Sequence, residues 1–329
     1  MNRLRKDRRH PDILWPGGMR MRAIAWRGPR VRELEAWEQV SRARPVWVDL
    51  ARPEEAELAA ARRVFALPPL LLQEHAAQRH RALLREGPQG MVALTLPLGA
   101  PDADTDVLEV VWGEEFLLSV HRKPAPCVVA AARRLAREAR GRAGAAFSLY
   151  LLLDEAVEAA FPELDQLQET IFQLEGELAS RPGRAFLTRL FHTRRHVLQL
   201  RRVLAGQRQV LSRLLSDAYR RRLAELHPYM EDVHDHLSLA LETLDSFHEV
   251  LSSTVESYLS SASNRLNQIM KTLTILATVM MPLTLITGIY GMNFRIPEVR
   301  WAYGYYYSLG LMAAVTLMML LYFRSRRWI

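Results

Sequence analysis

The tripeptide Gly291-Met292-Asn293 stands near the end of an uncharged run, Thr272 to Phe294. A second uncharged run, Trp301 to Phe323, begins seven residues later. Each run has 23 residues, enough for a helix to cross the ~30 Å hydrocarbon core of a bilayer at ~1.5 Å per residue. The runs therefore predict two membrane spans joined by a short polar loop, with the Asn293 amide at the membrane surface.

Polar and small residues recur on the first predicted span at steps of three or four, which places them on one face of a helix. The members of this stripe are Asn267, Met270, Leu273, Ala277, Met281, Thr284 and Gly288. A ring of such helices would line a narrow pore, and its bulky Met270, Leu273 and Met281 would form a constriction that closes by dewetting. The same stripe also fits a surface for helix packing, so its periodicity alone leaves both interpretations open.

The neutral amide of Asn293 suits the mouth of such a pore. Mg²⁺ dehydrates reluctantly and keeps several of its waters. A ring of amide oxygens would bind the hydrated ion through those waters without holding it too tightly to leave. The tripeptide Gly291-Met292-Asn293 is therefore the predicted selectivity filter.

A second group of possible metal ligands follows His227-Pro228. Asp232, Asp235 and His236 stand at i, i+3 and i+4, so a helix would present them on one face, with His227 and His234 nearby. Imidazole favours Zn²⁺ over Mg²⁺. Solvated helix charges are the more common explanation of such a group, and a zinc site is the alternative.

Charges beside the spans predict their orientation. Arg265 and Lys271 precede the first span, and an Arg-rich tail follows the second, so the positive-inside rule places both termini in the cytoplasm. Arg295 and Arg300 oppose this in the outer loop, against the single acid Glu298, but the inner side carries more positive charge. We expect a multi-pass protein of the cell (inner) membrane.

Between Met21 and about Lys123, strand-like runs alternate with helical ones, which predicts an α/β domain. The strand-like runs are Arg22–Trp26, Val46–Leu50, Met91–Leu96, Val107–Trp112 and Phe116–Val120. A hairpin is expected at Gly113-Glu114-Glu115. Helices are expected over Pro53–Phe65 and Pro69–Arg81.

Beyond Pro124 only helical patterns remain, over Cys127–Arg140, Phe147–Ala179 and Phe186–Ser216. From Tyr229 to about Tyr290 the pattern predicts some 60 residues of continuous helix, roughly 90 Å long. A helix of that length cannot pack within one small domain, and its last third is the first span. The predicted parts are a disordered basic tail (1–20), an α/β cytosolic domain (21–145), a cytosolic helical segment (146–227), a long helical stalk (228–271), two transmembrane helices (272–293 and 304–323) joined by an outer loop (294–303), and a basic tail (324–329).

Composition excludes several other classes of protein. The net charge is +8, but the basic residues are almost all Arg and are interleaved with Asp and Glu, so we expect no nucleic-acid partner. The single Cys127 excludes an internal disulfide. The chain has no P-loop, no Gly-rich dinucleotide turn and no metal-hydrolase helix motif, so we expect no enzyme and no organic cofactor.

The residues around the tripeptide resemble the CorA family of divalent-cation channels. Tyr290 to Phe294 carries the family signature, and the likeness extends to the stalk, the first span, the loop and the second span. The segments that carry it are Tyr258–Ser261, Asn264–Thr272, Met281–Thr284, Pro297-Glu298, Trp301, Tyr303–Tyr305 and Trp328-Ile329. Weaker likeness covers Trp47–Asp49, Leu67–Arg81 and Leu108–His121.

The resemblance implies a funnel-shaped homopentamer in the membrane lipid, with the first spans lining the pore and the second spans facing lipid. It implies uptake of Mg²⁺, with Co²⁺ and Ni²⁺ as lesser substrates. It also implies regulatory carboxylates between cytosolic domains that bind Mg²⁺ and hold the channel closed; Glu74 and Asp232 match them. Mg²⁺ would then be both the transported and the regulatory ion, and ordinary solvated charges are the alternative for these two residues.

Two departures from the family pattern stand out. Arg295 occupies a position after the signature that is often acidic, which would weaken cation capture unless Glu298 compensates. The segment after Glu74 matches only loosely, as Gln78–Arg81. A zinc-transporting branch of the superfamily is the first alternative, although Met292 and Pro297-Glu298 favour magnesium. A non-conducting two-span scaffold or receptor is the second.

Overall fold

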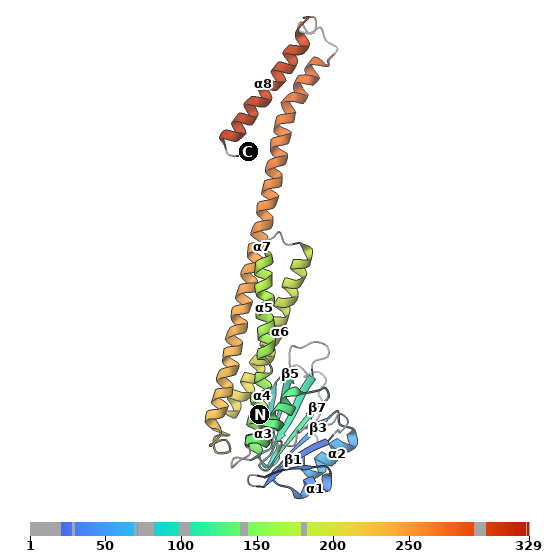
Figure 1. The fold of residues 1–329 in the computed structure, drawn as a ribbon, viewed down its shortest axis with the longest axis vertical. Helices are drawn as coiled ribbons and strands as arrows, with labels where there is room; N and C mark the ends of the chain where they lie inside the picture. The colour runs from blue at the N-terminus through green and yellow to red at the C-terminus, as the bar shows by residue number, and fades with distance from the viewer. Residues whose placement is uncertain are drawn as a thin grey trace, which may run out of the picture. The chain divides into compact units, whose positions relative to one another are not determined.

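Figure 1 shows the computed structural model of the chain. The structure describes residues 21–27, 30–68, 71, 82–98, 106–138, 144–178, 183–292, 301–326 and 328. The chain divides into two compact units, residues 1–252 and 253–329, and helix α7 contributes to both. The predicted helix Pro69–Arg81, apart from Leu71, and the predicted basic tail at residues 1–20 fall outside the described residues. The part boundaries set out above remain predictions.

The first unit contains a sheet of seven strands among its described residues, in the order β2-β1-β3-β7-β6-β5-β4. All neighbours are antiparallel except the central pair β3 and β7, which is parallel. The strands are β1 Met21–Arg27, β2 Arg30–Leu34, β3 Val46–Ala51, β4 Leu83–Glu86, β5 Val92–Leu98, β6 Asp106–Trp112 and β7 Phe116–His121.

The five strand predictions are confirmed, and so is the hairpin, in which Gly113 N–H donates to the Phe116 carbonyl at 2.9 Å. The sequence prediction missed β2, β4 and the six-residue helix α1 (Trp37–Arg42). Both missed strands lie at the sheet edges and hold charged residues, so they lack a long apolar run. Helix α1 is too short to show a helical period.

Helices cover both faces of this sheet. On one face α1 and α2 (Glu55–Val64) bury Val40, Ala61 and the following Phe65 against the strands, and Phe65 stacks on Phe116 at 4.4 Å between ring centroids. Helix α2 begins with a capping box, in which the Glu54 N–H donates to Glu57 Oε2 at 2.7 Å. On the other face α4 (Ala145–Glu158) contacts β3, β6 and β7 and is buried almost all round.

Most of the helices predicted beyond Pro124 are confirmed, and one predicted helix is two helices in the structure. The helices are α3 Pro126–Glu138, α5 Phe161–Leu178, α6 Arg184–Leu214, α7 His227–Tyr290 and α8 Gly304–Ser325. The single helix predicted over Phe147–Ala179 is wrong, because α4 and α5 are separate. Pro162 in the first turn of α5 cannot donate a hydrogen bond to the preceding helix, which explains the break.

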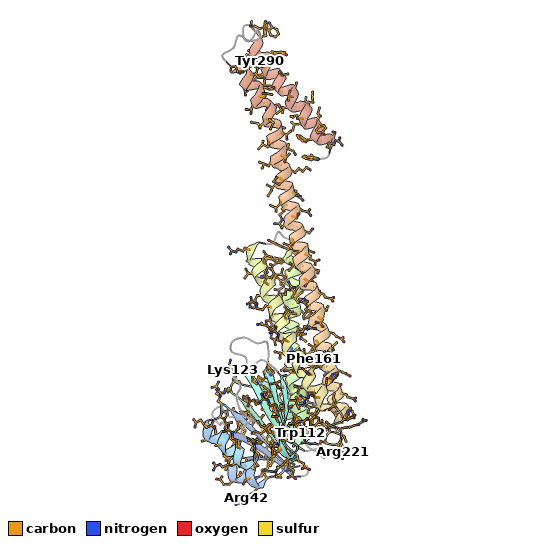
Figure 2. All side chains as sticks on the ribbon, turned by 180° about the vertical axis from the view of Figure 1, so that it is seen from behind. Arg42, Trp112, Lys123, Phe161, Arg221 and Tyr290 are labelled. Carbon is orange, nitrogen blue, oxygen red and sulfur yellow. The ribbon has the colours of Figure 1, made fainter. Side chains whose placement is uncertain are left out.

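Helix α6 and the turn after it are anchored to the β4–β5 edge of the sheet. The buried Gln207 amide donates to the Pro97 carbonyl at 2.8 Å, and Tyr219 donates to Glu86 Oε1 at 2.7 Å. The Arg222 guanidinium lies 3.8 Å from the ring centroid of the buried Trp112. Figure 2 labels Trp112 and Arg221 at this junction. The edge strand β4 is therefore covered rather than open to pairing.

Opposite charges line the neighbouring helices α5, α6 and α7. Helix α6 has eight arginines and no Asp or Glu, whereas α5 has five acidic residues and no Lys or Arg. His196 on α6 lies 2.6 Å from Glu163 on α5, and Arg201 pairs with Asp245 on α7. The exposed Arg201–Asp245 pair contributes little stability by itself, and the His196–Glu163 pair is half-buried, so the main effect of these pairs is to fix which faces of the helices meet.

A polar network lies buried at the parallel β3–β7 pair. The strand register places Asp49 opposite Ser119. Trp47 Nε1–H donates to Ser119 Oγ at 3.0 Å, and Ser119 Oγ–H donates to Asp49 Oδ1 at 2.6 Å. His121 Nε2 lies 3.4 Å from Asp49 Oδ2. Burial lowers the pKa of Arg22 below its usual range, and the nearby Asp49 carboxylate opposes that effect.

We predict that Ser119→Ala destabilises the protein by about 1–3 kcal/mol, because Trp47 loses its acceptor and Asp49 a donor where water does not reach. Urea unfolding of the full chain in detergent, followed by tryptophan fluorescence, measures this. Ser41→Ala is the matched control, since the exposed Ser41 hydroxyl bonds only the Glu38 carbonyl. Equal losses in the two variants would contradict a role for the network.

Candidate functional site

The second unit holds the end of α7, from residue 253, and helix α8. Each helix contains an apolar window long enough to cross a membrane. No residue of the α7 window is buried, and 6% of the α8 window is buried. Exposed apolar surface of this extent needs a covering other than water. A bilayer or further helices would provide it.

The predicted stripe lies on one exposed face of α7. All seven members are exposed: Asn267, Met270, Leu273, Ala277, Met281, Thr284 and Gly288. Met281 is the most exposed of its large apolar side chains, at 73%. None of the seven is buried against another described residue of this chain, so the face is available to line a pore or to contact another helix.

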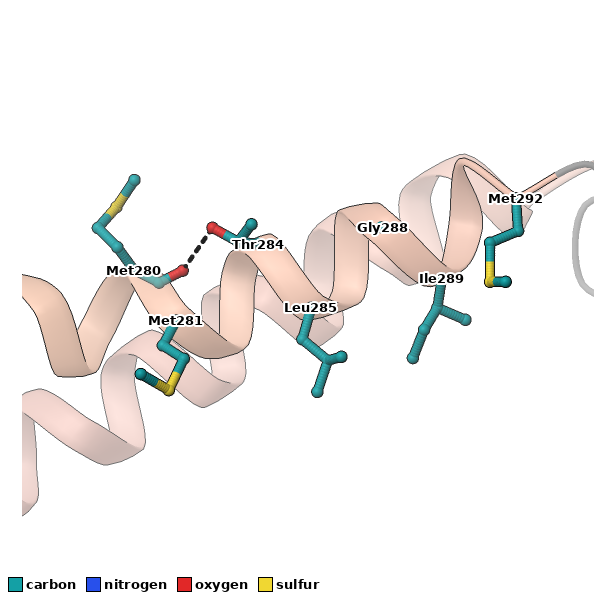
Figure 3. Close-up of a pocket in the computed structure, with 7 residues that line it drawn as sticks. All are labelled: Met280, Met281, Thr284, Leu285, Gly288, Ile289 and Met292. Atoms are coloured by element: carbon teal, nitrogen blue, oxygen red, sulfur yellow. Dashed lines mark hydrogen bonds between the residues drawn. The ribbon is translucent and has the colours of Figure 1, made fainter.

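Near the end of α7 part of the stripe lines an open groove of about 540 Å³. Met281, Thr284 and Gly288 of the stripe share this groove with Met280, Leu285, Ile289 and Met292. Figure 3 shows Met281, Leu285, Ile289 and Met292 projecting to the same side of the helix. Gly288 contributes no side chain to the groove. A Cβ added at this residue would meet nothing within 4 Å.

The threonine hydroxyls of this helix bond to its own backbone. Thr284 Oγ1–H donates to the Met280 carbonyl at 2.9 Å, and Figure 3 draws this bond. Thr274 and Thr278 donate in the same way to the carbonyls of Met270 and Thr274, at 2.8 and 2.7 Å. Each hydroxyl proton is therefore used, and each oxygen keeps lone pairs that accept hydrogen bonds.

The predicted filter lies directly beyond the last turn of α7. Gly291 N–H donates to the Thr287 carbonyl at 2.9 Å, and Met292 N–H to the Ile289 carbonyl at 3.2 Å. A Cβ at Gly291 would stand 3.0 Å from the Thr287 oxygen, tighter than nearly all real contacts. The glycine thus permits this close turn. Asn293 and Glu298 lie outside the described residues.

Aromatic side chains gather at both ends of α8. Before it, Trp301 packs against Tyr303 and Tyr307, with ring centroids 6.3 and 6.0 Å apart. After it, Phe323 stacks on Trp328 at 5.8 Å, and the Arg326 guanidinium lies 5.8 Å from the Tyr322 ring centroid. Rings of this kind favour the headgroup region at the two faces of a bilayer.

A separate group of possible metal ligands lies in the first unit. One ligand atom from each of Asp154, Glu158 and His236 falls within 4.8 Å of the others. His236 Nδ1 lies 3.4 Å from Glu158 Oε1, and His236 Nε2 lies 3.9 Å from Asp232 Oδ1. Of the predicted zinc ligands, His236 belongs to this group and Asp232 lies beside it. The Asp235 carboxylate lies 3.7 Å from His234 Nδ1 instead.

An arginine already occupies one side of this group. Arg134 donates to Asp154 Oδ2 at 2.5 Å and to Glu155 Oε1 at 2.9 Å. Burial lowers the pKa of Arg134, but the bonds to the two carboxylates outweigh it and raise the pKa above its usual range. Asp154 is therefore compensated, and the groups open to an ion are Glu158, His236 and Asp232.

The remaining predicted ligands are dispersed. His234 Nε2 lies 3.3 Å from Ser212 Oγ, and His227 Nδ1 lies 3.5 Å from Glu231 Oε2. Asp232 is exposed on the first turns of α7, while Glu74 lies outside the described residues. Sequence reasoning missed Asp154 and Glu158, although their i, i+4 spacing could have signalled them. The apolar run around them in α4 hid that signal.

Comparison with known sequences gives a family match and relatives over most of the chain. Residues 42–327 match the model of the CorA-like Mg²⁺ transporter protein family. YfjQ of Bacillus subtilis is 32% identical over 287 residues, which cover 86% of this chain and 89% of YfjQ. The cobalt/magnesium transport protein CorA of Thermotoga maritima is 39% identical over 184 residues, 56% of this chain and 52% of that protein.

A solved structure shares the fold. The complete CorA magnesium transporter of Methanocaldococcus jannaschii superimposes with a TM-score of 0.79 at 20% identity, covering 95% of this chain and 99% of that one. The expected fold class, a soluble α/β domain followed by a long helix and apolar C-terminal helices, is therefore confirmed.

We predict opposite effects for alanine at Gly288, which lines the groove, and at Gly291, which follows α7. Gly291→Ala should lower the melting temperature, because its Cβ presses on the Thr287 oxygen. Gly288→Ala should leave it unchanged or raise it, since alanine favours a helix by up to ~1 kcal/mol and has open space here. Thermal unfolding in detergent measures both. A loss at Gly288 would mean that this face packs tightly on another helix.

Proposed function

Because this chain belongs to the CorA-like Mg²⁺ transporter family, we propose that it is a membrane channel that conducts Mg²⁺ into the cytoplasm. Membership itself makes it a divalent-cation transporter and a membrane protein. The observation that carries the finer proposal is the exposed stripe on α7, which leads without interruption to Gly291-Met292. Co²⁺ and Ni²⁺ would be lesser substrates, and the membrane would be the cell membrane, with both termini in the cytoplasm.

The pore would be lined by one α7 from each subunit of a homopentamer. A single exposed face cannot enclose water, so the stripe requires copies of itself around an axis. Thr284 would then offer an oxygen that accepts hydrogen bonds from the waters of a hydrated cation, since its proton is bonded to Met280. Met270, Leu273 and Met281 would form the narrow apolar section that closes by dewetting.

The filter would consist of Gly291, Met292 and Asn293. Gly291 allows the tight turn that ends α7. Asn293, two residues further on, would then stand at the rim of the pore. A ring of amide oxygens would bind the waters around Mg²⁺ and strip few of them, because this ion dehydrates reluctantly. Glu298 in the outer loop would offset the positive charge of Arg295 and Arg300.

Uptake would be driven by the membrane potential. Moving one charge across 100 mV is worth ~2.3 kcal/mol, and a divalent ion gains about twice that. The sequence contains no nucleotide-binding motif that would supply another source of energy. The channel would therefore need a regulatory site that closes it when the internal Mg²⁺ concentration is high.

The regulatory site would be a Mg²⁺ site formed by Glu74 and Asp232. Asp232 is exposed, and its carboxylate oxygen is a ligand type that Mg²⁺ prefers. The ion would hold the closed state because it binds that state better, and it can shift gating only by that difference in affinity.

Zinc transport is the second candidate. The observation in its favour is that His236 lies beside Glu158 and Asp232, which together offer nitrogen and oxygen ligands to one ion. Such a mixed set suits Zn²⁺ better than Mg²⁺. It would identify a zinc-regulated or zinc-conducting member of the superfamily.

We predict that Asn293→Ala lowers Mg²⁺ uptake by roughly tenfold or more, because the filter loses its amide oxygens. Uptake into liposomes that hold the purified protein, under an inside-negative potential, measures this for Mg²⁺ and Zn²⁺ separately. Gln268→Ala is the control, since it removes an amide from a position of α7 outside the stripe. Zn²⁺ uptake without Mg²⁺ uptake would favour the zinc candidate, and unchanged Mg²⁺ uptake in Asn293→Ala would refute the filter.

Replacing both Glu74 and Asp232 with alanine should make uptake insensitive to Mg²⁺ inside the liposomes. The double variant loses both carboxylates of the regulatory site, whereas Glu231→Ala removes an exposed neighbouring carboxylate and should keep the inhibition. Uptake is measured at low and at millimolar internal Mg²⁺. Inhibition that persists in the double variant would show that the regulatory ion binds elsewhere.

A further inference from the structure

The outer face of α6 is basic and carries two exposed apolar side chains. Phe191, Arg195, Leu198 and Arg202 follow one another at steps of four, three and four, so they share the face that points away from the core. Phe191 is 52% and Leu198 42% exposed. Neither arginine forms an ion pair or side-chain hydrogen bond with another residue that the structure describes.

The outer face of α7 is the acidic counterpart. Leu239, Glu242, Ser246 and Glu249 follow at steps of three, four and three, and all four are exposed. Leu239 is 56% exposed. Within the described part of the chain, neither glutamate side chain has an ionic or hydrogen-bonded partner. The two faces thus carry unpaired charges of opposite sign at the same seven-residue spacing.

These faces do not meet within one chain. Within the chain, the described contacts between α6 and α7 are Arg201 with Asp245, at the edge of the acidic face, and Ser212 with His234. We propose that the outer face of α6 in one copy binds the outer face of α7 in the next copy, with Arg195 against Glu249 and Arg202 against Glu242. This inference rests on the proposed ring of subunits and assigns the contact that closes it.

The register of α6 and α7 supports that pairing. Between the contacts Arg201–Asp245 and Ser212–His234, α6 advances eleven residues while α7 recedes eleven. The helices are therefore antiparallel, and on this register Arg202 is level with Leu244 and Arg195 with Leu251. Glu242 and Glu249 lie two residues from those levels, or about 3 Å along the axis. An arginine side chain spans that offset.

Cyclic symmetry would preserve these levels. Rotation about an axis parallel to the helices moves each residue around the ring without raising or lowering it. Arg195 and Arg202 of one copy would then meet Glu249 and Glu242 of the next at matching heights. The contact joins two different surfaces, so it can repeat around the axis, and under the cyclic symmetry assumed here it forms a ring. Its exposed charges would set the register and speed the encounter of copies more than they add affinity.

Thiol cross-linking between differently tagged copies tests the contact. The full-length chain would carry Cys127→Ser, although Cys127 is buried and burial raises the pKa of its thiol to about 11. Copies with Arg202→Cys are co-expressed with copies with Glu242→Cys and treated in the membrane with a short bismaleimide, because a direct disulfide is too short to replace an Arg–Glu pair. We expect covalent dimers that contain both tags. Glu231→Cys is the matched control, since it is exposed on the same helix eleven residues away, or about 16 Å.

Charge reversal gives a second measurement. Arg195→Glu with Arg202→Glu should lower the fraction of intact oligomer in detergent, and adding Glu242→Arg with Glu249→Arg should restore it. Arg208→Glu, an exposed arginine of α6 outside this face, should leave the oligomer intact. Mass measurement by light scattering provides the readout. Folding of each variant is checked by circular dichroism, and the cross-linking result decides where a variant does not fold.

The outcomes separate this inference from the proposed function. Intact oligomers that transport Mg²⁺ without forming the Arg202–Glu242 cross-link would overturn the contact and leave the channel standing. A monomeric, non-conducting protein would overturn both. Cross-linking together with charge rescue would establish the contact.

Discussion

Everything in the membrane unit depends on one constraint: inside a bilayer a polar backbone group must find its partner within the protein. Helix α7 meets it by continuing to Tyr290, with Pro282 as a residue that has no N–H to donate, and its threonines meet it by donating to their own backbone. The polar groups of the stripe can therefore stand on an apolar helix. What the helix cannot provide by itself is a wall around water, so assembly follows from the same constraint.

The soluble unit solves a different problem, which is to hold long helices beside a sheet. Its central strands β3 and β7 are buried on both faces, and Asp49, Ser119 and Trp47 satisfy one another there. At the sheet edge, Gln207 and Tyr219 bind α6 and its following turn to β5 and β4. The faces of α6 and α7 that turn outward are consequently fixed. Their charges therefore stand in a fixed position to bind a neighbouring copy.

The sequence allowed much of this fold to be predicted, for identifiable reasons. Strands β3, β5 and β7 are long apolar runs, and α7 from Tyr229 on is a long stretch with one proline and no glycine before Gly288. The edge strands β2 and β4 were missed because they are short and contain charged residues, so they show no long apolar run. Side-chain partners were harder to predict, since the meeting of Glu158 on α4 with His236 on α7 depends on packing that no local pattern encodes.

The threonine bonds of α7 have a consequence for ions of the other sign. An anion such as chloride needs hydrogen-bond donors to replace its water, but the hydroxyl proton of Thr284, the threonine of the stripe, is already given to the Met280 carbonyl. From Met270 to Gly288 the stripe therefore offers no free side-chain donor. A passage lined by it would discriminate against anions without a single fixed negative charge.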